Sequence, residues 1–448
     1  DLTAYTLGAA ARFVSGPAWS HNGVIGIDGY RLRNFADDFT PFASATDSAL
    51  RAARGGADRT TLRLSSTWRG SDAGPVGLSL SGAVEYSLLR QETPVIALGN
   101  PGAGVGGPRA QARPQTAATT SNAELVTWLN DLGMSVQADS AVRNRWFATA
   151  GLRIERNNGY LTTPHYSALP VLGASWVADA GPATIKLRAA FGSGMRAPRT
   201  AARETLAGAM RMQSLGQDLD PERQSGIEAG ADLFIGHSFT AQATLFDQRA
   251  DGLIQQVVVP SSGAGRNAPV RLTLQYQNVG AITNRGLELQ ATARSGPLAL
   301  MGSATFVRSL VASVATGYSG ELRAGDRAMG VPARTLAATA AWSGRDWQIG
   351  LTATRAADWV EYDRIALSKA YTGFDRRDVP LWGADLRGYW RTYQGNTNLR
   401  ASISRRLTNA LRVTVTADNL LGEQVGQPDN MTIVPGRTIT TGVRWMRF

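Results

Sequence analysis

The 448-residue sequence contains no cysteine and only three histidines. Without cysteine, disulfide scaffolds, thiolate metal sites and cysteine nucleophiles are all excluded. His21, His165 and His237 lie far apart in the chain, so neither a histidine-rich metal centre nor a serine hydrolase triad is indicated. We therefore expect a protein that is not an enzyme and that carries no metal and no cofactor.

Long hydrophobic runs are also missing. Glycine, arginine, aspartate or threonine interrupts every apolar stretch before it reaches the roughly 18 residues of a membrane-spanning helix, so helical transporters are excluded. Charged residues make up 18% of the chain and hydrophobic residues 43%, a composition too apolar for a disordered protein. The first residues show no basic segment followed by an apolar one, so we expect any signal peptide to have been removed or to lie further upstream.

Lysine is almost absent. Of the 46 basic residues only Lys186 and Lys369 are lysines, and the formal net charge is +11. The arginines are spread along the chain, whereas nucleic-acid-binding proteins concentrate such charge on one helix or patch. We therefore expect no nucleic acid partner. Arginine spread along strands and loops suits a polar channel interior or a surface that faces anionic lipid.

What the sequence does contain is a two-residue rhythm. From Glu222 onward, segments of about 10 residues alternate apolar and polar side chains, which predicts strands with one apolar and one polar face. In residues 411–419, for example, Leu411 and Val413 share a face, and Arg412 and Thr414 share the other. The same alternation is found in residues 227–233, 287–294, 335–342, 347–354 and 399–404.

The connections between these segments alternate between very short and long. The short ones predict tight hairpin turns; they are residues 236–237, 295–297, 343–346 and 408–410. The long ones are rich in glycine and arginine; they are residues 249–280, 308–334, 356–395 and 422–436. Short turns at one rim and long loops at the other are typical of an outer-membrane β-barrel.

Aromatic residues lie near the ends of the predicted strands. Trp342 and Trp347 flank one short turn, Phe239 follows another, and Phe306 lies toward a long loop. This placement matches the aromatic girdles of membrane barrels. A soluble β-sandwich with tryptophans at its edges is the alternative.

The whole chain predicts about 17 strands in an all-β, antiparallel barrel. The odd number is awkward, because single-chain bacterial barrels normally close with an even number, so strands are either miscounted or missing. The segment 124–138 also fits an amphipathic helix. The predicted spans are residues 3–14, 22–33, 60–69, 76–89, 124–138, 143–156, 166–178, 183–193, 223–235, 238–250, 271–293, 298–309, 335–343, 346–357, 397–407, 410–420 and 436–447.

Several sequence segments follow one another in a characteristic order. The run IKLRAAFGSGMRAP at 185–198 is followed by LDPER at 219–223 and GIEAG at 226–230. This succession is similar to the middle of the barrel in TonB-dependent outer-membrane receptors. The run ADNLLG at 417–422, with residues 435–437 and 442–448, resembles their last two strands. Further matching segments are residues 243–246, 251–254, 276–280 and 284–289.

The resemblance implies a receptor whose barrel of about 22 strands encloses an N-terminal plug. We expect residues 1–448 to form one transmembrane β-barrel domain, the C-terminal portion of such a receptor, without the plug and the first strands. The missing part is then either unresolved or a separate chain. The resemblance further implies active uptake across the cell outer membrane of a scarce ligand such as a ferric siderophore, cobalamin or an oligosaccharide. The TonB complex would act through the plug.

Candidate site residues fall into three groups. Loop arginines could attract an anionic ligand or contact lipopolysaccharide, and loop aromatics could stack on a ligand or pack within the loop. Polar residues of the strands are expected to line the lumen, and the terminal aromatic residue is implied by the resemblance to be an assembly signal. The residues are Arg196, Arg199, Arg203, Arg211, Trp359, Tyr362 and Trp382 in loops; Glu228, Asp232, Glu288, Gln290 and Arg294 in the lumen; and Phe448 at the end.

Two other functions remain open at this point. A plugless barrel would be a passive porin, and a barrel with two open edges would be a structural outer-membrane protein assembled with other chains. Ion conductance would favour the porin, and stoichiometric neighbours would favour the structural role. Expected partners in every case include outer-membrane lipid and lipopolysaccharide.

Overall fold

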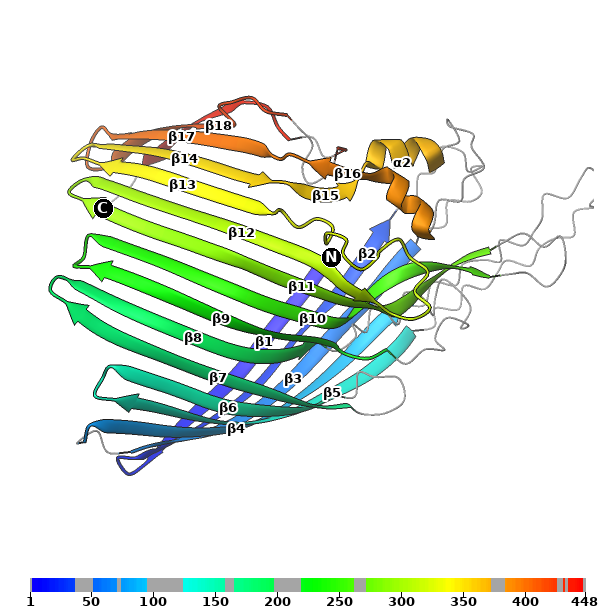
Figure 1. Ribbon diagram of the computed structural model, residues 1–448, viewed down its shortest axis with the longest axis horizontal. Coiled ribbons are helices and arrows are strands. Elements are labelled where there is room, and N and C mark those ends of the chain that lie inside the picture. Colours follow the sequence, from blue (N-terminus) through cyan, green and yellow to red (C-terminus); the bar gives the residue numbers. More distant parts are fainter. Residues whose placement is uncertain are drawn as a thin grey trace, which may run out of the picture.

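The structure is a computed structural model of the chain. It describes residues 2–36, 51–70, 74–94, 124–157, 165–196, 219–261, 271–371, 383–424, 430–431 and 434–445. Most of these residues belong to strands, as Figure 1 shows. The helices of this part of the chain, α2 (Arg364–Tyr371) and η2 (Gly383–Tyr389), are too short and too polar to cross a membrane.

One sheet of 17 strands dominates the molecule. β15 (Trp359–Tyr362) and β16 (Trp390–Tyr393) form a separate two-stranded sheet. The strands of the large sheet are β1 (Leu2–Ser15), β2 (Trp19–Ala36), β3 (Arg51–Arg69), β4 (Val76–Pro94), β5 (Glu124–Val142), β6 (Trp146–Asn157), β7 (His165–Ala180), β8 (Ala183–Arg196), β9 (Glu222–Ile235), β10 (Phe239–Ser261), β11 (Arg271–Ser295), β12 (Leu298–Val314), β13 (Arg334–Ser343), β14 (Trp347–Ala357), β17 (Asn396–Arg406), β18 (Leu411–Asp418) and β19 (Thr438–Trp445).

Each strand of the large sheet pairs antiparallel with its neighbour in the chain. The one jump is from β14 to β17, where the chain leaves the sheet to form β15 and β16. Among the described residues, β1 pairs with β2 alone and β19 with β18 alone. The predicted all-β, antiparallel fold and its 17 strands are confirmed. The helical alternative for residues 124–138 is wrong, because β5 pairs along its whole length with β4.

The sheet is strongly curled rather than flat. In Figure 1 the blue and cyan strands β1 to β5 pass behind the green strands β8 to β11. Tight turns connect the strands at one end, and the long connections, with α2 and β15, lie at the other. We call these the short-turn end and the long-loop end.

One face of the sheet is apolar from edge to edge. The register places Trp342 opposite Ile349, Ile349 opposite Ile403, and Ile403 opposite Val415. These side chains lie on a single layer, over which no second sheet of the described residues packs, and Val415 keeps 36% of its surface exposed. The β-sandwich alternative is therefore wrong, because a sandwich would bury this face in a dry core.

The opposite face is polar. Gln348 pairs with Ser404, and the hydroxyl groups of Ser404 and Thr414 are hydrogen-bonded at 3.0 Å. Thr339 and Thr352 make a similar contact at 3.2 Å between β13 and β14. Because neighbouring side chains of a strand alternate between faces, the two-residue rhythm of the sequence becomes two chemically distinct surfaces.

Tryptophans gather on the apolar face at the short-turn end. Trp19 is paired with Trp68 across β2 and β3, and the rings of Trp146 and Trp176 lie 6.0 Å apart across β6 and β7. Tryptophan suits the boundary between hydrocarbon and headgroups, since its ring is apolar and its N–H is polar. Further members of this girdle are Trp342, Trp347 and Trp445.

Buried apolar side chains are concentrated at the long-loop end. They come from the long-loop ends of β10, β11, β12 and β14, from β15 and β16, and from the segment 315–333 that follows β12. Residues 325–328 continue the sheet beside β12 beyond the start of β13, with the Val311 amide donating to the Asp326 carbonyl at 2.8 Å. The one compact core of the described chain therefore lies above the wall, where a folded loop covers it.

Candidate functional site at the long-loop end

A folded loop structure at the long-loop end is built from the segments that follow β12 and β14, and the segment after β18 contacts it through Asn430. We define the loop module as residues 315–333, β15, α2, η2 and β16. Two main-chain hydrogen bonds join its parts: the Gly330 amide donates to the Val360 carbonyl, and the Ala333 amide to the Asp358 carbonyl, at 2.8 and 3.0 Å. The second bond lies directly before β13 and directly after β14, so it fixes the module where the chain enters and leaves these two strands of the wall.

An aromatic pair forms the centre of the loop module. The rings of Trp359 and Tyr393 are stacked, with centroids 5.7 Å apart and planes 6° apart. Trp359 is 3% exposed. The Tyr393 hydroxyl donates to the Tyr362 carbonyl at 2.8 Å, which links β16 back to β15. Trp359 therefore presents no open ring face in this structure, and its assignment to a ligand stays a prediction.

Tyr362 is also engaged inside the loop module. Its hydroxyl donates a hydrogen bond to the carboxylate of Glu321. Burial, reinforced by the Glu321 carboxylate, raises the pKa of this hydroxyl above its usual range, since both effects disfavour a phenolate. Tyr362 therefore stays a hydrogen-bond donor at all physiological pH values, and its contact with a ligand likewise stays a prediction.

An arginine–aspartate pair fastens η2 to the segment 315–333. Arg387 donates from Nη1 and Nη2 to the two carboxylate oxygens of Asp326, at 2.5 and 2.9 Å. The guanidinium lies 4.4 Å from the ring centroid of Trp390. The Arg387 hydrogen bonds are the main reason why the pKa of Asp326 is lowered. Bidentate pairing of this kind fixes orientation as well as distance.

A second aspartate caps the helix of the module. Asp363 precedes α2 and accepts a hydrogen bond from the Ala366 amide at 2.9 Å, as an N-cap residue does. The Asn430 side-chain amide donates to the same carboxylate at 2.6 Å, which ties the segment after β18 to the module. The Ala366 amide first, and then Asn430, lower the pKa of Asp363.

These two carboxylates predict that the loop module opens in acid. Because the pKa values of Asp326 and Asp363 are lowered by folding, their stabilisation is complete above the ordinary aspartate pKa of about 3.9. It is lost as the pH falls below that value and through the folded-state pKa. Hydrogen-exchange protection of β15 and β16, corrected for intrinsic rates, should therefore hold from pH 7 to about 5 and collapse toward pH 3.

A substitution separates this effect from general acid unfolding. Asp326→Asn removes the charge that Arg387 binds, so we expect about ten-fold lower protection already at pH 7 and a flatter pH profile. Asp385→Asn is the matched control, because Asp385 is an exposed residue of η2. Equal protection of the wild-type module at pH 3 and pH 7 would contradict the assignment.

The described part of the arginine-rich connection before β9 carries one of the predicted arginines. Arg196 ends β8 and lies 3.3 Å from the carboxylate of Glu222, measured from Nη1 to Oε2. Glu222 also accepts the Ile254 amide at 2.9 Å. Arg199, Arg203, Arg211 and Trp382 lie outside the described residues, as does Phe448.

Asn278 connects three segments where this connection enters the wall. Its side-chain oxygen accepts the Asp220 amide at 2.8 Å, and its amide nitrogen donates to the carbonyls of Asp220 and Gly252 at 2.9 and 2.6 Å. Asn278 belongs to the segment 276–280, one of those that carry the family resemblance, but the sequence does not show which groups it binds. Its role here is to hold the start of β9 against the bulge in β10.

The five predicted lumen residues share the polar face. Asp232 is opposite Gln242, and Gln242 is opposite Gln290. The Asp232 carboxylate is buried and lies 3.3 Å from Nε of Arg188 on β8, which supplies the positive partner that a buried carboxylate needs. The other three lie on the same face: Glu228, which accepts Gln248 at 3.2 Å, and Glu288 and Arg294 of β11.

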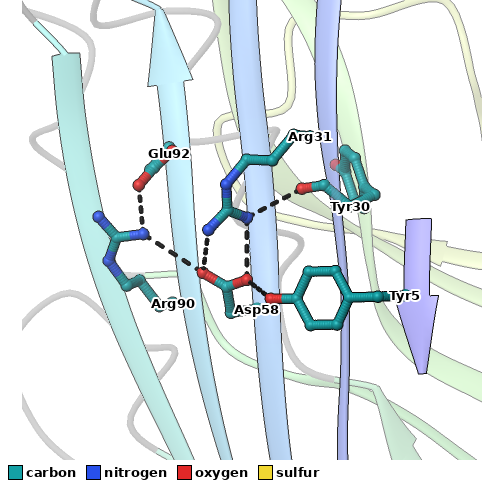
Figure 2. Close-up of polar contacts among 6 residues, drawn as sticks. All are labelled: Tyr5, Tyr30, Arg31, Asp58, Arg90 and Glu92. Carbon is teal, nitrogen blue, oxygen red and sulfur yellow. Dashed lines mark hydrogen bonds and ion pairs between the residues drawn. The ribbon is translucent and has the colours of Figure 1, made fainter. Parts of the chain in front are cut away.

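A charged cluster that the sequence does not reveal lies on the apolar face at the long-loop end of β1 to β4 (Figure 2). Arg31 donates to both carboxylate oxygens of Asp58, at 2.8 and 2.7 Å. The Tyr5 hydroxyl donates to the same carboxylate, and Arg90 contacts both Asp58 and Glu92. Two arginines and two carboxylates thus neutralise one another at the upper edge of the apolar band.

Glycines make room for this cluster. Gly29 lies between Tyr5 and Asp58 in the register, and a Cβ atom there would lie 2.6 Å from the Tyr5 hydroxyl oxygen. A Cβ atom at Gly56 would lie 2.9 Å from Cδ of Arg31. The Tyr5 and Arg31 side chains can lie flat across the sheet because these two positions carry no side chain.

Comparison with known proteins agrees with this architecture. A family model described as TonB dependent receptor-like, beta-barrel matches residues 1–420. Similar solved structures include a mutant of the ferric enterobactin receptor of Pseudomonas aeruginosa, with 16% identity and a TM-score of 0.66, over 99% of this chain and 61% of that one. The siderophore receptor PirA of Acinetobacter baumannii, with 12% identity and a TM-score of 0.66, is covered over 62% of its length by 99% of this chain.

A third similar structure is the ferric-catecholate import receptor Fiu of E. coli K12. It is 12% identical, with a TM-score of 0.63, and 99% of this chain covers 64% of it. The chain therefore spans less than two thirds of the length of these structures, and at such identities the likeness concerns the fold. No curated protein matches the sequence.

Proposed function

Because the chain belongs to the TonB-dependent receptor-like β-barrel family, we propose that it forms the wall of an outer-membrane receptor that takes up a scarce ligand actively. The observation that carries the proposal is the division of one continuous sheet into an apolar face, with a tryptophan girdle, and a polar face. Such a sheet suits hydrocarbon on one side and water on the other.

We propose an anionic ferric chelate of the siderophore type as the ligand class. The excess of 46 basic over 35 acidic residues favours an anion, and arginine can bind carboxylate or catecholate oxygens with two donors. Arg196, Arg199, Arg203 and Arg211 are the proposed attracting residues of the connection before β9. Trp359, Tyr362 and Trp382 are the proposed aromatic residues of the ligand-binding loops.

The proposed partners follow from the family. Energy would come from the inner-membrane TonB complex, acting on a plug in the lumen. The polar face, with Glu228, Asp232, Glu288, Gln290 and Arg294, is proposed to surround that plug and the ligand path. Phe448 is proposed to be the signal that the barrel-assembly machinery recognises. We propose no enzymatic activity, since the arrangement calls for binding and passage rather than bond chemistry.

Uptake of radioactive iron by cells tests this function. Cells whose other iron receptors have been deleted and that express the native gene should accumulate iron from ferric enterobactin, and lose uptake when TonB is deleted or the proton gradient is collapsed. Replacing Arg196, Arg199, Arg203 and Arg211 together by glutamine should raise KM for this anionic chelate at least about ten-fold, because each arginine binds a charged oxygen. Its maximal rate should change little.

The control is a neutral ferric hydroxamate chelate, for which the fourfold substitution should leave KM unchanged. Uptake of ferric enterobactin that persists without TonB would reject active transport. Ion conductance of the purified protein in a planar bilayer, without ligand, would instead favour a passive pore.

A further inference from the structure

A groove lies on the apolar face of β9 to β12, near the long-loop end. Its volume is about 670 Å³, and its floor is made of aliphatic and aromatic side chains that lie side by side on four neighbouring strands. Ile227 and Leu245 are 56% and 61% exposed, so the sheet leaves the groove floor open, and contiguous exposed apolar surface of this kind marks a membrane or ligand contact. The remaining floor residues are Leu287 and Phe306, and Arg285 and Arg308 form the upper end.

The upper end of the groove holds two like charges face to face. Arg285 on β11 is directly opposite Arg308 on β12, an arrangement that destabilises a sheet unless a negative group lies nearby. Asp247 supplies one, with Oδ2 2.9 Å from Nε of Arg285. Within the residues that the structure describes, no carboxylate makes an ion pair with Arg308, whose side chain is exposed.

The positive excess extends over the neighbouring strands. Arg223 and Arg249 point to the same side on β9 and β10, and Asp251 pairs with Arg249 at 2.8 Å. Among the side chains that the structure describes along this rim of β9 to β12, four arginines therefore face two aspartates. The cluster of Figure 2, on the same face, contains two arginines matched by two carboxylates and has no such excess.

The groove lies at the depth where headgroups meet hydrocarbon. On β12 the apolar side chains run from Leu298 to Phe306, and Arg308 is ten residue steps from Leu298, about 33 Å along the strand. Strands of membrane barrels are tilted by roughly 35–45°, so this length rises about 25 Å across the membrane. The apolar band of a membrane barrel is about 25 Å tall. Arg308, the next residue on that face, therefore lies at the upper boundary of the band, with Phe306 just inside it.

We propose that this groove binds one phosphorylated glycolipid of the outer leaflet. An acyl chain lies on the floor formed by Ile227, Leu245 and Phe306, and a phosphate bridges Arg285 and Arg308. The phosphate supplies the negative charge that the opposed arginines lack. The acyl chain runs from the headgroup level toward the hydrocarbon and covers the apolar floor. The proposal uses the outer-membrane orientation of the proposed function but is independent of transport.

Binding of lipid A to the purified protein in detergent tests the proposal. Native mass spectrometry should show one bis-phosphorylated lipid A bound per chain. The double substitution Arg285→Gln and Arg308→Gln should raise Kd at least about ten-fold, because two charged contacts to one phosphate are lost. Arg63→Gln with Arg412→Gln is the matched control: it removes the same charge from the polar face and should leave Kd unchanged.

Further probes separate headgroup from chain and from free ion. Lipid A without its phosphates should bind the wild type as weakly as intact lipid A binds the double variant. Inorganic phosphate at the same concentration as lipid A should not displace lipid A from the wild type. If the double variant does not fold, Arg308→Gln alone should still weaken binding, since its loss breaks no ion pair of the described residues. Four outcomes would each overturn the proposal. They are unchanged lipid A binding by the variants, an equal loss of binding in the control, full displacement of lipid A by inorganic phosphate, and a second copy of the protein bound in the groove. These outcomes do not depend on iron uptake, so they can be told apart from failure of the proposed function.

Discussion

Leu289→Arg is expected to destabilise the barrel by about 2–4 kcal/mol in a bilayer, the cost of an arginine at the midplane of a membrane barrel. Leu289 lies near the middle of the apolar face of β11, opposite Ala243 and Ala304, and is 40% exposed. An arginine there would have to carry its charge through hydrocarbon or draw water and headgroups inward. The free energy of unfolding, measured by urea titration in phosphatidylcholine vesicles with tryptophan fluorescence, gives the value.

The neighbouring residue is the control. Gln290 is on the polar face, opposite Gln242 and Ser303. Gln290→Arg introduces the same side chain one residue further along the strand, and its charge can reach water in the lumen. We expect a change within about 0.5 kcal/mol. Equal costs at the two positions, or a larger cost at Gln290, would mean that the face assigned to lipid is wrong.

The strands could be predicted from the sequence because their information is local. A period of two, interrupted by turn residues, identifies a strand without knowledge of its neighbours, and each predicted span overlaps one strand of the sheet. The ends of the strands are predicted less accurately, because pairing extends several strands beyond their alternating part. For example, β10 continues to Ser261, whereas the alternating pattern ends near Ala250. There the partner strand, and not the side-chain pattern, keeps the chain extended.

The polar and charged clusters could not be predicted in the same way. Tyr5 and Asp58 are 53 residues apart in the chain, and Arg387 and Asp326 are 61 apart. Such contacts depend on the register of several strands or on how a loop folds back, which no local pattern contains. The sequence shows that residues 356–395 are rich in aromatic side chains, but only the structure shows that the rings of Trp359 and Tyr393 stack on each other.

Gly395→Val is expected to detach the loop module from the wall and to cost about 3 kcal/mol or more in stability. Gly395 has a φ of +78°, in the region that residues with a side chain rarely adopt. A Cβ atom there would lie 1.9 Å from the carbonyl oxygen of Ala356, a main-chain atom that cannot move aside. Gly395 joins β16 to β17, so the distortion falls where the chain passes from module to wall.

The variant should show a specific pattern rather than general unfolding. Hydrogen exchange should speed up in β15 and β16 at pH 7, while β9 to β12 keep their protection, because those strands are paired through contacts that do not involve Gly395. Gly388→Ala is the control, since a Cβ atom at Gly388 meets nothing within 4 Å; its protection should match the wild type. Loss of protection throughout the sheet would show instead that the module is part of the wall's own folding unit, because strands that open together form one cooperative unit.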